Sequence, residues 1–151
     1  MFDSNGGDLA PHDFQLFSLA YVERIARDVR ERLRARELPC VPLILFAKGA
    51  SPALAATATY DVIGLEWTVD PRDGAIPREV ALQGNLDPVV LYGGRDAIER
   101  EVKRMCAEFR TIRPATGWIA NLGHGITPGV DPDDLKWFFE CVHRYSRVEK
   151  E

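Results

Sequence analysis

The residues best suited to chemistry in this sequence are an amide and an imidazole, Asn121 and His124, which end an apolar run and are flanked by glycines. An imidazole titrates near pH 6.5, so it can exchange a proton or bind a carboxylate or carbonyl group. The earlier segment 80–88 repeats this plan, because its apolar run also ends in glycine, asparagine and aspartate. Since the carboxyl ends of parallel strands meet at one edge of a sheet, both segments predict ligand-facing loops.

Other polar and aromatic residues have structural interpretations. Lys48 follows an apolar run and could meet a carboxylate, but a lysine at a strand end equally well extends into solvent. Asn85 and Asp87 are interpreted as residues that shape the loop before a proline. The three tryptophans are interpreted as core or helix-packing aromatics: Trp67, Trp118 and Trp137.

The three cysteines, Cys40, Cys106 and Cys141, are odd in number and widely separated, so we interpret them as buried thiols in a reducing compartment. Cys141 and His143 lie two residues apart on a predicted helix, which directs their side chains to different faces. We therefore expect no metal site.

Alternating helices and strands must position these residues. An apolar rhythm predicts a long helix over 13–37, ended by Pro39 and Pro42. Capping and periodicity predict further helices at 51–58, 95–109 and 132–147. Apolar runs predict strands at 43–47, 62–65, 80–83 and 118–121, and the segment 2–4 has the character of the end of another strand.

The fold class that follows is α/β. The predicted strands are apolar throughout, which is typical of a parallel sheet covered on both faces. The length of 151 residues, 46% of them hydrophobic, fits a single domain. The net charge of −4 and the lack of a basic stripe argue against nucleic acid as a partner. No apolar run reaches the roughly 20 residues of a membrane span. Arginines in the segment 24–36 alternate with acidic residues, which predicts a solvated, salt-bridged helix face.

Five segments in order resemble the carboxyl-terminal half of the uroporphyrinogen decarboxylase family, nearly end to end. They are Phe2-Asp3-Ser4 with Gly7 and Leu9, Pro42 to Lys48, Gly64 to Val69, Leu82 to Pro88 and Asn121 to Gly125. The resemblance implies the carboxyl-terminal half of a (β/α)8 barrel, with parallel strands and outer helices. Residues 1–151 would form one partial barrel domain from which the amino-terminal half is absent.

The resemblance also implies a function. Members of this family are cofactor-free lyases, usually homodimers, that remove four acetate carboxyl groups from uroporphyrinogen to give coproporphyrinogen in porphyrin biosynthesis. By motif, Ser4 and His124 match family residues that contact the substrate. No residue is assigned as catalytic with certainty. We expect a cytoplasmic protein, or a plastid protein in a photosynthetic source, with no cofactor, no nucleic acid and no membrane as a partner.

Three functions remain open at this stage. The chain is either a fragment or short form of the decarboxylase, a non-catalytic half-barrel that binds a tetrapyrrole or a partner, or a methyltransferase-like member of the same superfamily. The family's arginine-rich motif, central aspartate and active-site tyrosine belong to the other half of the barrel. We therefore expect the isolated chain to be inactive as a lyase.

Overall fold

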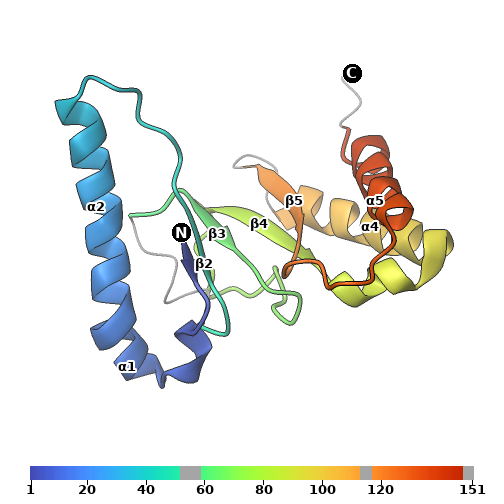
Figure 1. The fold of residues 1–151 in the computed structure, drawn as a ribbon, viewed down its shortest axis with the longest axis horizontal. Helices are drawn as coiled ribbons and strands as arrows, with labels where there is room; N and C mark the ends of the chain where they lie inside the picture. Colours follow the sequence, from blue (N-terminus) through green and yellow to red (C-terminus); the bar gives the residue numbers. More distant parts are fainter. Residues whose placement is uncertain (52–58, 113–116, 148–151) are drawn as a thin grey trace.

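The backbone forms a five-stranded, entirely parallel sheet, in a computed structural model that describes residues 1–51, 59–112 and 117–147. Each strand pairs with the next one along the chain (Figure 1). This order is the one that a partial barrel requires, so the α/β prediction is confirmed. The strands are β1 (Phe2–Asp3), β2 (Ile44–Ala47), β3 (Val62–Gly64), β4 (Ala81–Leu86) and β5 (Trp118–Leu122).

The first long helix is continuous but mixed in type. It runs through α1 (Pro11–Phe14), a π-helical stretch η2 (Gln15–Leu19) and α2 (Ala20–Ala35), and it follows the short 3-10 turn η1 (Gly6–Asp8). The helix ends earlier than predicted, and the cause is not a proline. Leu38 N donates to Leu33 O at 2.9 Å, and Glu37, whose φ is 56°, donates to Arg34 O at 3.0 Å. These bonds close a Schellman motif that satisfies the last carbonyl groups.

The helices of the second half follow their capping signals. The 3-10 helix η3 (Pro88–Tyr92) begins where Asp87 accepts a hydrogen bond from Val89 N at 2.9 Å, and it leads to α4 (Gly94–Ile112). The last helix, α5 (Pro132–Tyr145), begins where Asp131 accepts from Asp133 N at 2.8 Å. The helix predicted at 51–58 lies outside the described residues, except for Ser51.

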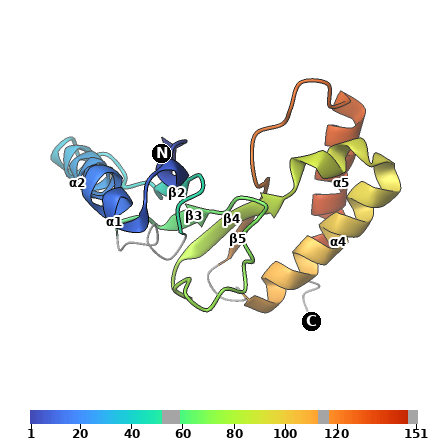
Figure 2. The ribbon, with the colours of Figure 1, turned by 90° about the horizontal axis from the view of Figure 1, so that it is seen from below.

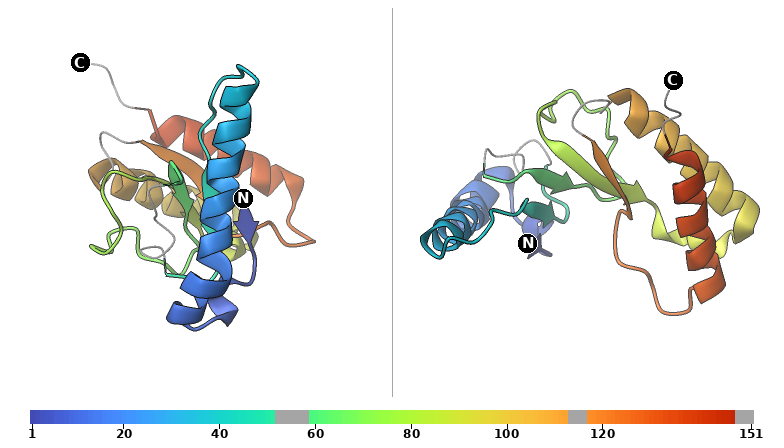
Figure 3. Two further views of the ribbon diagram at one scale, coloured as in Figure 1. Left: turned by 90° about the vertical axis from the view of Figure 1, so that its left-hand side faces the viewer. Right: turned by 90° about the horizontal axis from the view of Figure 1, so that it is seen from above.

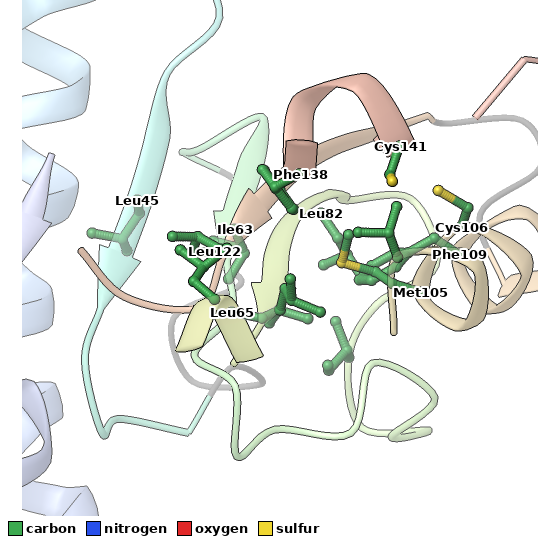
Figure 4. Packing of buried hydrophobic residues seen from close by; sticks show 14 of the residues in the cluster. Leu45, Ile63, Leu65, Leu82, Met105, Cys106, Phe109, Leu122, Phe138 and Cys141 are labelled. Carbon is green, nitrogen blue, oxygen red and sulfur yellow. The ribbon is translucent and has the colours of Figure 1, made fainter. Parts of the chain in front are cut away.

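The hydrophobic core lies on one face of the sheet. Leu45, Ile63 and Leu82 are neighbours in the strand register and all are at most 1% exposed. They belong to one buried cluster that also includes side chains from α4 and α5, among them Met105, Cys106, Phe109, Phe138 and Cys141 (Figure 4). The ring of Phe109 also stacks on Trp118 of β5, with 4.7 Å between ring centroids and an angle of 8°.

The opposite face of the sheet is largely open, so the expectation of burial on both faces is wrong for it. Phe2 is 77% exposed and Ile119 is 42% exposed, and both share this face with Phe46 and Gln83. Figure 2 and Figure 3 show α2 at one end of the sheet and the α4–α5 pair at the other, so that the molecule forms an arch. The open face lies inside this arch.

Two expectations about surface residues need correction. Arg30 does not simply extend from a solvated helix face, because its Nη2 atom lies 2.7 Å from Asp61 Oδ2 and 3.0 Å from Thr59 O. This ion pair ties α2 to the start of β3.

Cys40 is exposed, whereas Cys106 and Cys141 are buried as expected. Burial raises the pKa of both buried thiols. No helix in the described ranges is long and apolar enough to cross a bilayer.

Candidate functional site

A cavity of about 810 Å³ occupies the inside of the arch. One wall comes from α2, through Ile25, Ala26 and Val29, and the opposite wall comes from α5. The floor is the open face of the sheet, with Phe46 of β2 and Gly64 of β3. Such a space, large and mostly apolar with few polar groups, is typical of a site for a small organic ligand.

The polar groups of the floor lie toward β4 and β5. Gln83 and Asn121 line the cavity, and the register of β4 against β5 places them on the same face of the sheet. The Asn121 oxygen accepts a hydrogen bond from Leu122 N at 2.9 Å. His124 follows two residues after β5 and also lines the cavity. The sequence pattern at the end of β5 therefore does direct an imidazole toward an open space.

His124 meets an aromatic side chain from a neighbouring loop. The rings of His124 and Trp67 are perpendicular, at 85°, with 5.8 Å between their centroids. Trp67 follows β3, and at 39% exposure it is not a core residue. The interpretation of Trp67 as a packing aromatic is therefore wrong, whereas Trp118 stacks on Phe109 as interpreted.

Hydrogen bonds from the Asn85 side chain hold the loop that carries Trp67. Its Nδ2 atom donates to Glu66 O at 3.0 Å and to Val69 O at 2.8 Å. Val69 N also donates to Glu66 O at 3.2 Å, so the loop closes as a turn. Asp87 has the role predicted for it, because it accepts from Val89 N beside Pro88. Asn85 does not shape the loop before Pro88, because it lies within β4 and holds the loop after β3 instead.

Ser4 lies apart from the cavity floor. It follows β1, is exposed, and is not among the residues that line the cavity. Ser4 and His124 both follow the carboxyl end of a strand, but β1 and β5 are the two outer strands of the sheet. Both residues therefore lie at the carboxyl ends of the strands, but they follow strands on opposite sides of the sheet, and the structure does not bring them together. Their role in substrate binding stays a prediction.

The loops after β1 and β2 are packed closely against each other. A Cβ atom on Gly7 would lie 2.5 Å from the Gly49 Cα atom, so a side chain is excluded there. Lys48 joins the two loops through its backbone, since its N–H donates to Asp3 O at 2.9 Å and its carbonyl accepts from Gly7 N at 2.7 Å. The Lys48 side chain is half-buried and does not line the cavity.

The side chains that line the cavity carry little positive charge. Among the described residues, no lysine or arginine lines it. The described part of the chain also contains no group of three His, Cys, Asp or Glu side chains that could hold a metal ion. Cys141 is buried and His143 is exposed, in agreement with the prediction that they point to different faces.

Two lining or neighbouring residues, Gln83 and Trp67, were not predicted as part of a site. A signal for Gln83 exists, because it is a polar residue inside an apolar strand and alternates with buried Leu82 and Gly84. Trp67 directly follows a strand, as His124 does, and the same argument about strand ends applies to it.

Comparison with known proteins assigns the chain to a family. The sequence model of the uroporphyrinogen decarboxylase (URO-D) family matches residues 1–145. The uroporphyrinogen decarboxylase of Schizosaccharomyces pombe is 45% identical over 151 residues, covering 97% of this chain and 42% of that protein. The human enzyme of the same name is 42% identical, covering 98% of this chain and 40% of that protein. The bacterial one of Acinetobacter baylyi is 43% identical, covering 97% and 41%. The chain thus spans about two fifths of the length of these relatives.

Proposed function

Since the chain belongs to the uroporphyrinogen decarboxylase family, we propose that it supplies the carboxyl-terminal part of a carboxy-lyase barrel that converts uroporphyrinogen to coproporphyrinogen. In each of four steps an acetate side chain loses carbon dioxide and gains a proton, which leaves a methyl group. Protonation of a pyrrole carbon lets the ring accept the electron pair of the breaking bond. The protein must therefore orient the tetrapyrrole, hold its carboxylates and move protons.

The observation that carries this proposal is that His124 lines a large, mostly apolar cavity that the amides of Gln83 and Asn121 also line. The apolar floor and walls suit the faces of pyrrole rings, and the amides of Gln83 and Asn121 suit polar substituents. An imidazole at this position can donate a hydrogen bond to a carboxylate or exchange a proton with a ring carbon. Ser4, which also follows the carboxyl end of a strand, would add a hydroxyl donor.

We further propose that these 151 residues do not decarboxylate the substrate when they are isolated. Uroporphyrinogen carries eight carboxylates, and the described residues that line the cavity include no lysine or arginine to neutralise them. The chain itself has a net charge of −4, which adds unfavourable long-range repulsion. The cations that neutralise the substrate must therefore come from other residues of a completed barrel.

The location and assembly of the completed enzyme are part of the same proposal. We propose a cytoplasmic homodimer, as the family resemblance implies. All three cysteines are free thiols, and Cys40 is exposed, which supports a reducing compartment.

A chimera tests the proposed function. The 151 residues replace the aligned segment of the Schizosaccharomyces pombe enzyme, which they match over 97% of their length. We expect the chimera to form coproporphyrinogen in an anaerobic assay with product chromatography, and the isolated chain to form none. A folded chimera without turnover would refute the assignment, and turnover by the isolated chain would refute its dependence on other residues.

A further inference from the structure

We propose that Trp67 is a positioning residue for His124, so that the loop after β3 sets the orientation of the imidazole at the end of β5. The contact between the two rings lies within this chain and does not depend on the other residues of a completed barrel. Its consequence for turnover rests on the function proposed above.

The first observation is the ring contact. The indole of Trp67 and the imidazole of His124 meet at 85° with 5.8 Å between centroids, which is a favourable edge-to-face geometry for two aromatic rings. Burial does not explain why an indole stands here, because 39% of Trp67 is exposed. Its partner, His124, carries the one imidazole of the segment between β5 and α5.

The second observation is that hydrogen bonds from β4 hold the loop that carries Trp67. Asn85 holds Glu66 O and Val69 O, the carbonyl groups on either side of the Trp67 segment, at 3.0 and 2.8 Å. Asn85 belongs to β4 and is paired in register with Asn121 of β5. Asn85 thereby ties the Trp67 loop to β4 and β5, the two strands that carry the polar part of the cavity floor.

The third observation is that the backbones of the two loops touch. A Cβ atom on Gly123 would lie 2.3 Å from Trp67 N, so only glycine allows this approach. Gly123 N also donates to Leu86 O at 2.8 Å, which continues the ladder between β4 and β5 to the residue before His124. The residue before His124 is thus held by the Trp67 backbone and by a hydrogen bond to β4, which fixes where the His124 backbone lies relative to Trp67.

The imidazole needs such a support. Its Nδ1 atom lies 3.3 Å from Gly125 O, but Gly125 belongs to the same loop, so this contact cannot fix the ring relative to the sheet. Trp67 comes from another element and can do so. A shift of about 1 Å in a catalytic or binding group commonly costs up to about 100-fold in rate, so the indole matters even without touching the substrate.

Histidine NMR on the chain itself tests the contact. Labelling of the Cε1 carbon gives one signal for each of the three histidines, and His124→Asn assigns the signal of interest. We expect Trp67→Leu, which keeps apolar bulk but removes the ring current, to move the His124 signal toward its position in the unfolded chain. Trp67→Phe should restore part of the shift. The matched control Trp137→Phe, on α5, should leave the His124 signal in place. A His124 signal that Trp67→Leu and Trp67→Phe leave unchanged would overturn the proposal.

A double-mutant cycle in the chimera tests whether Trp67 acts through His124. We expect Trp67→Leu to lower kcat/KM by roughly 10- to 100-fold and Trp67→Phe to recover most of the loss. When His124 is already asparagine, Trp67→Leu should change kcat/KM by less than about twofold. Multiplicative losses would mean that Trp67 acts independently of His124 and would overturn the proposal. An inactive chimera would refute the proposed function, whereas the NMR result would still decide whether Trp67 positions the imidazole.

Discussion

Replacing Gly123 by alanine should separate the two loops that form the His124 edge of the cavity. The new Cβ atom would lie 2.3 Å from Trp67 N and 2.8 Å from both Glu66 C and Trp67 Cα. Ordinary contacts of a Cβ atom begin near 3.4 Å, so the loops must move apart by about 1 Å. All three obstructing atoms belong to the backbone, and no side-chain rotation can relieve the clash. Overpacking of this kind costs about 1–3 kcal/mol.

Gly125→Ala is the matched control, because it lies two residues further along the same loop. A Cβ atom there meets no atom within 4 Å. The change should be neutral, or should stabilise the fold by about 0.4–1 kcal/mol by restricting the unfolded chain. Urea unfolding followed by circular dichroism measures both variants, and Gly123→Ala should also lower the Tm by about 2–12 °C. Equal stability of the two variants would refute the close contact between the loops.

Four further predictions concern the fold. Phe109→Ala removes a ring that is 1% exposed and stacked on Trp118, so it should lower the free energy of unfolding by about 3–5 kcal/mol, and Phe109→Leu should cost clearly less; equal losses in urea titrations would contradict the role of the stack. A thiol reagent should modify Cys40 rapidly and Cys106 and Cys141 only after unfolding, so Cys40→Ser should abolish the fast phase. Because burial raises the pKa of both buried thiols, the unfolded chain ionises first as the pH rises, and stability that is present below about pH 8.5 should decline above it, as pH-dependent unfolding would reveal. The isolated 151 residues should self-associate, since Phe2 and Ile119 leave an apolar open face and β1 and β5 are outer strands; a monodisperse monomer in light scattering would contradict this.

The elements of the second half could be predicted because their signals are local. Asp131 and Pro132 mark the start of α5, as capping chemistry requires. Asp87 and Pro88 mark the start of η3 in the same way, but no helix was predicted there. The parallel sheet was predicted because the strands are apolar throughout. β4 extends to Leu86, beyond the predicted end at Gln83, because Gln83 and Asn85 point to the open face and interrupt the apolar run.

Other features depend on tertiary contacts that a single sequence does not contain. The helix over 11–35 ends at a Schellman motif with Glu37 in the left-handed region, where a glycine is the usual signal. The exposure of Cys40 depends on the path of the chain between α2 and β2. Arg30 finds Asp61 across a gap of 31 residues, so its ion pair could not be distinguished from those on the helix surface.

The candidate site was predicted in part for the same reason. His124 and Asn121 could be found because a strand ends there, and strand ends share one edge of a parallel sheet. The partnership of Trp67 with His124 could not, because it depends on the approach of Gly123 to the Trp67 backbone. Sequence alone also gave no reason to separate Ser4 from the cavity, because the curvature of the sheet decides which strand ends face it.

Turnover of the chimera with and without His124→Asn tests the central claim most directly. If His124 contacts the substrate in a completed barrel, the variant should fold normally but lower the rate of coproporphyrinogen formation or enrich partly decarboxylated intermediates, because asparagine can replace one hydrogen bond but cannot exchange the proton. Product chromatography under anaerobic conditions measures both quantities. An unchanged rate together with an unchanged distribution of products would contradict the account and return His124 to a purely structural role.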